Sequence, residues 1–302
     1  MQQTDRCFRF ACLACAALAG LLMLGVFVQL GAHSAAAWQR FGLGFLCSAE
    51  WDPAQGIFGA APAIVGTLLT TLLALLFAIP LSFVAALFVT EAPDWLARPL
   101  SQAIDLLAAI PSVIYGMWGL FVLAPIMQDH VQPLLAAIPG STRLLGEDYN
   151  GFGFLTAGLI LSLMILPYMS AVMRDVFRMT PPMLREAAYG AGCTRWEATK
   201  DVVMRYGIRG ILGGIFIGMG RALGETMAVL FVIGNMMQLP EGLFSGGTTI
   251  AATLANNFAE SQGLEQSALF ALGLILLLMS FGIQVAAQYY LHLTGAKRGE
   301  AR

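Results

Sequence analysis

Long apolar runs separated by short polar segments dominate the chain. Six of these runs reach about 20 residues, the length at which an α-helix crosses the hydrocarbon core of a bilayer. They cover residues 10–30, 63–90, 104–127, 154–173, 208–236 and 267–291. The pattern therefore predicts an all-α polytopic membrane protein with six transmembrane helices.

The composition leads to the same class of protein. Of the 302 residues, 58% are hydrophobic and 11% are charged, whereas soluble domains contain about 25% charged residues. A water-soluble core could not take up so much apolar surface. The net charge of −2 points to no particular partner, and nucleic acid is not expected. The cysteine count is five, and only Cys47 falls in a predicted outer loop, so no disulfide framework is expected.

Basic residues fall almost entirely on one side of the predicted membrane. That side carries Arg6, Arg9, Arg98, Arg174, Arg178, Arg185, Arg195, Lys200, Arg205, Arg209, Lys297, Arg298 and Arg302, and the outer loops carry Arg40 and Arg143. By the positive-inside rule both termini are cytoplasmic, which requires an even number of spans. The first apolar run is long and lacks a convincing cleavage site, so we expect an uncleaved span rather than a signal peptide.

Prolines interrupt two of the predicted spans. Pro80 removes a backbone N–H from the second span and should kink or loosen it. Pro111 and Ser112 interrupt the third span, either as a broken helix beside a transport pathway or as a packing kink in which Ser112 bonds back to the backbone. The run 245–249 is rich in Gly, Ser and Thr but lacks the lysine of a P-loop, so a flexible linker is expected there.

The basic loop 174–207 contains two predicted helices. Thr180 can cap the first helix, whose body is 186–189. Glycines in 190–192 end it, because glycine accepts the left-handed backbone that closes a helix. The second helix begins at 194–197 with a capping box, in which a threonine hydroxyl and a glutamate carboxylate each accept a backbone N–H.

The fifth span combines close-packing residues with charge. Gly210, Gly214 and Gly218 recur every four residues, and at 100° per residue the last two share an arc of roughly 60° with Arg221 and Glu225. Arg221 lies near the middle of its span, where an arginine costs roughly 2.5–3.5 kcal/mol unless it faces protein, water or a partner. Glu225, four residues on, is the partner predicted by helical geometry.

The loop carries a resemblance to a known family. Glu186, Ala187 and Ala188, followed by Gly192, resemble the coupling motif of ABC-transporter permeases, in which a short helix docks into a cleft on the ATPase subunit. The chain departs from the family pattern at Arg205, where that pattern has a proline.

Two further segments, 107–116 and 220–229, resemble the PstC-type permeases of phosphate ABC importers, and the similarity extends over roughly residues 63–290. The resemblance implies a type I ABC importer permease fold, with one extra amino-terminal span before a five-span core. It also implies a multi-pass protein of the bacterial inner (plasma) membrane.

The resemblance implies partners as well. These are a second permease subunit of the PstA type, a dimer of PstB-type ATPase subunits, an extracytoplasmic phosphate-binding protein of the PstS type, and membrane lipid. The chain has no G-x-x-x-x-G-K sequence, so we expect ATP to be bound by the partner and not by this chain. We expect a transport subunit rather than an enzyme, with no catalytic residue, metal or other cofactor of its own.

Arg221 and Glu225 allow two interpretations. In the structural one, the pair neutralises itself and locks its helix among neighbours. In the functional one, Arg221 offers a planar fork of donors to a phosphate, and Glu225 holds the fork and offsets its charge, so that the dianion is released again. The resemblance implies that both residues belong to the translocation pathway, and Ser112 is a third candidate for it.

Three alternative functions differ in how well the sequence supports them. An arginine fork suits sulfate or molybdate as well as phosphate, so the choice of phosphate rests on the resemblance. An autonomous secondary transporter would also need paired intramembrane charges, but six spans are few for one and it has no use for a coupling loop. A membrane enzyme acting on lipid is disfavoured, because no catalytic triad, carboxylate pair or metal cluster emerges.

The predicted organisation has four parts. Residues 1–31 form a cytoplasmic amino terminus and the first transmembrane helix, and 32–62 a periplasmic segment. Residues 63–291 form the five-helix transmembrane domain with the coupling loop, and 292–302 a cytoplasmic tail.

Overall fold

The structure is a computed structural model that describes the backbone of residues 2–146 and 148–299 and the side chains of 6–141, 144–146 and 148–292. In these ranges the chain is helical and forms no strand, as predicted. The long helices are α1 (Gln2–Phe41), α3 (Ala61–Glu91), α4 (Asp94–Ala109), α9 (Phe154–Arg178), α12 (Met204–Leu223) and α15 (Gly263–Gly299). The short helices are α2 (Gly44–Cys47), α5 (Ser112–Trp118), α6 (Ala124–Ile126), α7 (Gln132–Ala136), α8 (Thr142–Leu145), α10 (Pro182–Gly190), α11 (Arg195–Glu197), α13 (Met227–Leu230) and α14 (Ile250–Asn257). Three π-helical segments join some of them: η1 (Gly119–Leu123), η2 (Met127–Val131) and η3 (Ala198–Val203).

Five helices of the described chain are long and apolar enough to cross a membrane, and a bent helix pair makes six if it counts as one span. The bent pair corresponds to the predicted third span. Its two halves, Asp94–Ala109 and Ser112–Ala136, meet at 96°. Ile110 adopts an extended conformation because the proline after it disfavours helical backbone. The predicted interruption at Pro111 and Ser112 is therefore confirmed, but 104–127 is not one straight helix.

The fifth span differs from its predicted position. Its helix runs over Arg195–Leu223 and not over 208–236, because the second helix of the loop continues into the membrane segment through η3. It ends before Gly224, and the four-residue helix α13 follows after a turn. The prediction that the helix reaches residue 236 was therefore wrong.

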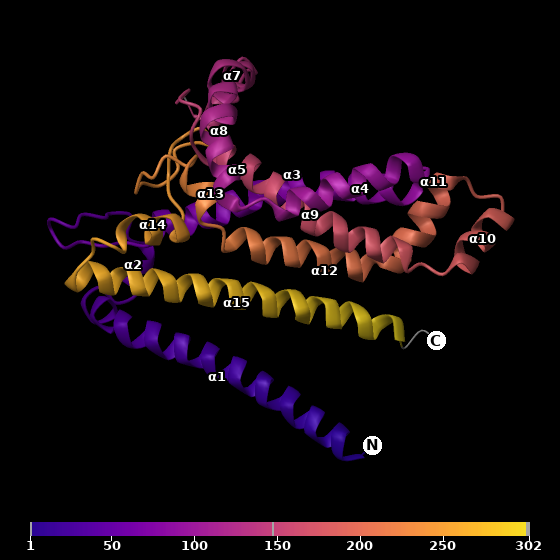
Figure 1. Ribbon diagram of the computed structural model, residues 1–302. Coiled ribbons are helices and arrows are strands. Elements are labelled where there is room, and N and C mark those ends of the chain that lie inside the picture. Colours follow the sequence, from indigo (N-terminus) through magenta and orange to yellow (C-terminus); the bar gives the residue numbers. More distant parts are fainter. Residues whose placement is uncertain (1, 147, 300–302) are drawn as a thin grey trace.

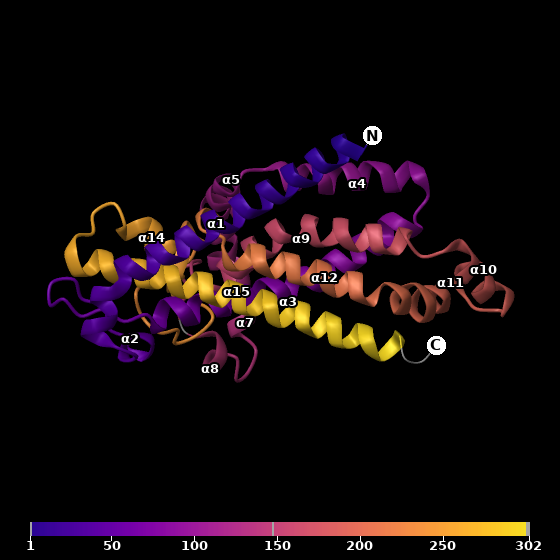
Figure 2. The same cartoon turned by 90° about the horizontal axis from the view of Figure 1, so that it is seen from below.

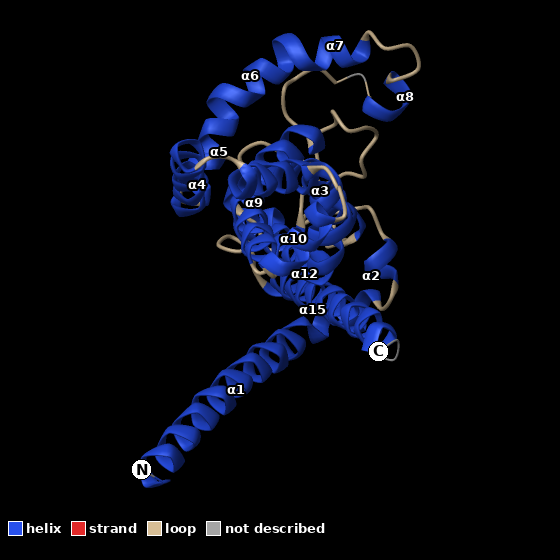
Figure 3. Cartoon of the chain, turned by 90° about the vertical axis from the view of Figure 1, so that its right-hand side faces the viewer, coloured by secondary structure: helices blue, strands red, loops and turns tan. Residues whose placement is uncertain are grey.

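Helix α9 lies at the centre of the bundle, between α3, α12 and α4 (Figure 1). The end-on view in Figure 3 shows α5 to α7 arching over the bundle and most of α1 pointing away from it. In Figures 1 and 2, α10 lies at one end of the molecule, with the start of α1 and the last turns of α15 directed toward that end. Helices α2 and α14 lie at the other end.

Glycines bring α12 into close contact with α9. A Cβ added at Gly210 would overlap the side chain of Val176, and one at Gly218 would come within 2.6 Å of Met169. At Gly214 the nearest atoms belong to Val172, at 3.3 Å. Small residues at every fourth position allow two helix backbones to approach closely. The predicted contact stripe of the fifth span is thus confirmed for its glycines.

A serine hydroxyl fastens α1 to α15. Ser267 donates to the carbonyl of His33 at 2.8 Å and accepts the N–H of Ala37 at 3.1 Å, which are two groups that could otherwise bond to each other within α1. Helix α1 extends beyond the predicted end near residue 30 and reaches Phe41. Only its carboxy-terminal part is packed in this way, and the apolar face from Phe8 to Val28 is exposed.

The segment 245–249 is not the flexible linker predicted from its composition. All five residues are buried. Gly247 bonds through its N–H to Ile233 and through its carbonyl to Met236, and a Cβ on it would overlap the ring of Phe154. Thr249 caps α14 by accepting the N–H of Ala252. The glycines serve close packing here, which composition alone does not distinguish from flexibility.

Gly210→Ala should destabilise the protein by about 1–3 kcal/mol, because the added methyl group overpacks the contact with Val176. Gly213→Ala is the matched control, since a Cβ at Gly213 meets nothing within 4 Å and alanine has the higher helix propensity. Thermal unfolding of the detergent-solubilised protein measures both. Equal midpoints for the two variants would contradict the proposed role of Gly210 in packing.

Candidate transport and coupling site

Helix α10 places the residues of the predicted coupling motif at the exposed end of the molecule. Glu186 and Ala187 are exposed on it, whereas Ala188 is buried. Gly192 has φ +87° and stands just after the helix. Its N–H binds the carbonyl of Tyr189, and the N–H of Cys193 binds that of Ala188, which is the Schellman pattern of a helix end. The predicted termination by glycine is confirmed.

The next helix begins as predicted, with a capping box. The Thr194 hydroxyl accepts the N–H of Glu197 at 3.3 Å, and the Glu197 carboxylate accepts the N–H of Thr194 at 2.8 Å. The helix then continues without a break through η3 into α12, in which Arg205 is the second residue. The residue that replaces the family's proline therefore lies inside a continuous helix, as the restored N–H permits.

Arg185 ties α10 to two membrane helices. Its Nη1 lies 3.0 Å from Oε1 of Glu91, at the end of α3, and its Nη2 donates to the carbonyl of Phe177 at 3.2 Å, in the last turn of α9. The two charged side chains are mostly shielded, with 24% and 30% of their surfaces exposed. Charge-assisted bonds to two helices at once fix the orientation of a short helix that has few contacts of its own.

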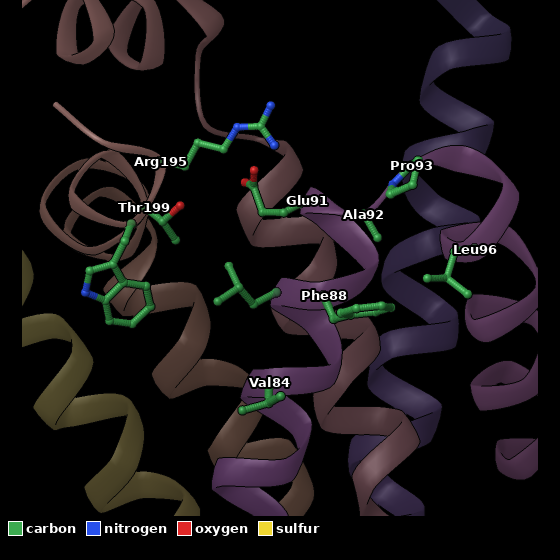
Figure 4. A pocket seen from close by; sticks show the side chains of 10 residues that line it. Val84, Phe88, Glu91, Ala92, Pro93, Leu96, Arg195 and Thr199 are labelled. Carbon is green, nitrogen blue, oxygen red and sulfur yellow. The ribbon is translucent and has the colours of Figure 1, made fainter. Parts of the chain in front are cut away.

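A pocket of about 450 Å³ opens beside this ion pair, between the end of α3, the start of α4 and the start of the helix at Arg195. Its walls are mainly apolar, and in Figure 4 Glu91 and Arg195 lie on one side of it, with Val84 on the opposite side. Around it and α10 several large apolar side chains are exposed, namely Met179, Met183, Leu184, Tyr189 and Trp196. Large apolar side chains exposed together on one short helix and beside it are a common feature of protein interaction sites.

Arg221 and Glu225 are not arranged as the sequence predicts. Helix α12 ends at Leu223, so Glu225 is not one turn above Arg221 on the same helix. The span runs over Arg195–Leu223, so Arg221 lies in its last turn, and the prediction that it lies near the middle of the span was wrong. The Glu225 carboxylate instead accepts the N–H of Ala228 at 3.3 Å, at the start of α13. The ion pairs found among the described residues do not include Arg221 with Glu225. A glycine directly after Leu223 and a carboxylate that competes for a backbone N–H explain why the helix stops there.

The guanidinium of Arg221 lies on an aromatic ring. Its Cζ is 4.1 Å from the ring centroid of Tyr168, which comes from α9. The hydroxyl of Tyr168 donates to the carbonyl of Ala108 at 2.9 Å, and that of Tyr115 donates to Leu107 at 2.8 Å. Both carbonyls belong to the last turn of α4, where helix ends leave carbonyls short of intrahelical partners; that of Leu107 also accepts the N–H of Ile110 at 3.3 Å.

Ser112, the third candidate, begins α5 four residues after Ala108, the residue at the end of α4 that accepts the bond from Tyr168. The hydrogen bond from Ser112 to a backbone carbonyl, one of the two interpretations, is not among those found for the described residues. Arg221 is exposed and Ser112 partly so. An apolar cavity of about 300 Å³ lies at the elbow, the bend between α4 and α5, and is lined by Ile110, Ile114 and Trp118 among others. Its apolar walls could not bind an anion, because they offer no groups to compensate the loss of hydration.

Sequence reasoning missed Tyr168 and the pair Arg185 and Glu91. A tyrosine in an apolar span is a weak signal, because its hydroxyl must find a partner but the sequence does not say where. Arg185 directly precedes the coupling motif, and Glu91 is the acidic residue that ends the second apolar run. Their pairing joins positions 94 residues apart, beyond the reach of any local pattern.

Comparison with known proteins places the chain in a family. A family model described as "Binding-protein-dependent transport system inner membrane component" matches residues 56–292. The chain belongs to this family of inner-membrane transport components.

Within the family, the similar proteins include phosphate transport system permease proteins named PstC. The protein from Pasteurella multocida is 51% identical over 86% of this chain and 83% of its own length. That from Haemophilus influenzae is 48% identical over 88% and 86%, and that from Mesorhizobium japonicum 47% identical over 98% and 92%. The chain is therefore a member of the PstC group of permeases.

Solved structures show the same fold at low sequence identity. The MetNI methionine ABC transporter in an inward-facing conformation matches with a TM-score of 0.60 and 14% identity, over 81% of this chain and 99% of that chain. A bacterial alginate ABC transporter matches with a TM-score of 0.59 and 18% identity, over 92% and 93%. The predicted type I ABC importer permease fold is confirmed.

Glu91→Gln should loosen α10, because a neutral amide weakens a charge-assisted bond worth about 1.5–3 kcal/mol. Chymotryptic cleavage after Tyr189 in the detergent-solubilised protein should become up to about tenfold faster. Asp94→Asn is the matched control: its pair with Arg98 has a distance of 2.8 Å, but both side chains are more than three-quarters exposed, where ion pairs contribute about 0–1 kcal/mol. Equal cleavage of both variants would contradict the role of the Arg185 pair.

Proposed function

We propose that this chain is the transmembrane permease subunit of an ATP-driven phosphate importer, in which it forms half of the translocation pathway. The observation that carries the proposal is the exposed guanidinium of Arg221 beside a broken membrane helix, in a chain about half identical to permeases named for phosphate transport. A charged group in a transmembrane helix is costly unless it faces a water-filled cavity, a substrate or the membrane interface, and the last turn of the span places Arg221 toward one side of the membrane.

Arg221 supplies the attraction for the anion. Its planar fork of N–H donors matches two oxygens of a phosphate. Glu225 lies close by in sequence and offsets part of the local positive charge, which favours release of the dianion. Its carboxylate also caps α13 and so shapes the turn after Arg221. Ser112 contributes a hydroxyl at the broken third span.

Coupling to ATP hydrolysis uses α10. Glu186, Ala187, Ala188 and Gly192 form the turn that docks on an ATPase subunit of the PstB type, which binds the ATP. The exposed apolar side chains of α10 support this contact. A second, PstA-type permease completes the pathway, and a PstS-type protein delivers phosphate on the opposite side. The basic residues near α10 and near both termini support a cytoplasmic location for the end of the molecule that carries α10.

In the proposed mechanism, closure of the ATPase dimer displaces α10. The bonds of Arg185 pass this displacement to the ends of α3 and α9. Because α9 packs along α12 through the glycine contacts, the helices move together. Arg221 is then exposed alternately to the two sides of the membrane.

Arg221→Gln should lower phosphate uptake at least about 100-fold, since it removes charge-assisted bonds worth together about 3 kcal/mol or more. The chain and its copurifying subunits are reconstituted in liposomes, and ATP-dependent uptake of labelled phosphate is measured with sulfate as competitor. Glu225→Gln should be impaired less, and Arg98→Gln, at an exposed site, should transport normally.

Each other result has a distinct meaning. Normal uptake by an assembled Arg221→Gln complex would remove Arg221 from the pathway and leave it a structural role. Complete competition by sulfate would indicate another oxyanion as substrate. Uptake without ATP would indicate a secondary transporter.

Gly192→Arg should uncouple ATP hydrolysis from uptake while membrane insertion stays intact. Gly192 has φ +87°, and a side chain in that conformation costs about 1–2 kcal/mol, so the docking turn is distorted. Gly190→Ala is the control, because Gly190 lies in α10 and a Cβ there meets nothing within 4 Å. Transport at the wild-type rate by Gly192→Arg would refute the coupling role of this turn.

A further inference from the structure

We infer that Tyr168 is a positioning residue for substrate passage: its ring holds the guanidinium of Arg221 flat and leaves the edge of that group directed at the anion. The inference rests on the proposed function of Arg221. Tyr168 itself need not touch the substrate, because it acts through the orientation of the arginine.

The geometry shows a contact between two helices. Arg221 is in the last turn of α12, and Tyr168 is in α9 directly after Pro167. The Cζ of Arg221 lies 4.1 Å from the ring centroid. In the part of the chain that the structure describes, no hydrogen bond or ion pair of the Arg221 side chain is found, and its contact with the Tyr168 ring is a cation–π interaction.

A ring orients an arginine without using up its donors. The guanidinium is planar, and its five N–H groups lie in the plane. An aromatic ring attracts the face of the group. A carboxylate, in contrast, would occupy two donors and cancel the charge. Because the carboxylate of Glu225 caps α13 instead, the ring takes over the orienting role that helical geometry had predicted for Glu225.

The ring is itself held at the helix break. The hydroxyl of Tyr168 donates to Ala108 at 2.9 Å, in the last turn of α4, shortly before the 96° bend. The position of Arg221 is therefore linked to the angle between α4 and α5. A movement of this elbow during transport would shift the ring and, with it, the donors of Arg221.

The test compares three substitutions in the complete complex, reconstituted in liposomes. Tyr168→Leu removes the ring, and Tyr168→Phe keeps the ring but loses the hydroxyl. Tyr115→Phe is the matched control, because Tyr115 also donates to the last turn of α4 but is not the ring under Arg221. Two rates are measured on each preparation: ATP hydrolysis stimulated by the loaded binding protein, which reports assembly, and uptake of labelled phosphate.

Tyr168→Leu should lower the phosphate carried per ATP hydrolysed by about twofold to thirtyfold, the range expected for loss of a cation–π contact. The two Phe variants should share a much smaller loss. If Tyr168→Leu does not assemble, Tyr168→Met, which is unbranched and also lacks the ring, replaces it. Equal losses in Tyr168→Leu and Tyr168→Phe would show that only the hydroxyl anchor matters and would overturn the inference, as would a wild-type ratio in Tyr168→Leu.

The result for Arg221→Gln separates this inference from the proposed function. An inactive Arg221→Gln complex together with a normal Tyr168→Leu complex overturns only the role of the ring. An active Arg221→Gln complex overturns the pathway itself.

Discussion

The close approach of α12 to α9 through glycine is the contact on which the rest of the arrangement depends. Gly210 and Gly218 have no Cβ to separate the two helices, so Val176 and Met169 fill the space between them. The same approach brings Arg221 over the ring of Tyr168. In a bilayer, apolar surface gives no preference for protein over lipid, and helix association relies on such close packing and on interhelical hydrogen bonds. The close packing of α12 on α9 and the position of the charged Arg221 side chain therefore depend on the same contact.

Helix α9 also contacts both candidate sites, the coupling helix α10 and Arg221. Its Phe177 carbonyl receives Arg185 from α10, and its Tyr168 lies under Arg221. Nine residues of helix separate these positions, which is about 14 Å at 1.5 Å per residue. A single rigid helix is thus in contact both with the proposed ATPase-docking turn and with the proposed substrate-binding arginine. No long chain of intermediate side chains is needed to connect them.

The sequence predicts best what local backbone rules decide. The spans follow from apolar length, and the end of α10 and the capping box follow from the conformational preferences of Gly192 and Thr194. It fails where distant parts of the chain decide. The segment 245–249 packs against Phe154, and α1 is fastened to α15 by Ser267. Glu225 was assigned by helical periodicity, but the helix had already ended at Leu223. Tyr168 and Glu91 owe their roles to partners 60 and 94 residues away.

The π-helical segment η3 sets the rotational phase between the two ends of the fifth span. It lies between the capping box of α11 and the glycines of α12. A π-helical turn accommodates one residue more than an α-helical turn. If 198–203 formed plain α-helix with no residue removed, the extra residue would turn everything after it by about 100° relative to α10. The glycines would then no longer face α9. Loss of one residue from this segment, with return to plain α-helix, would instead keep the glycines facing α9, so the π-helical turn is the means by which the span accommodates its extra residue.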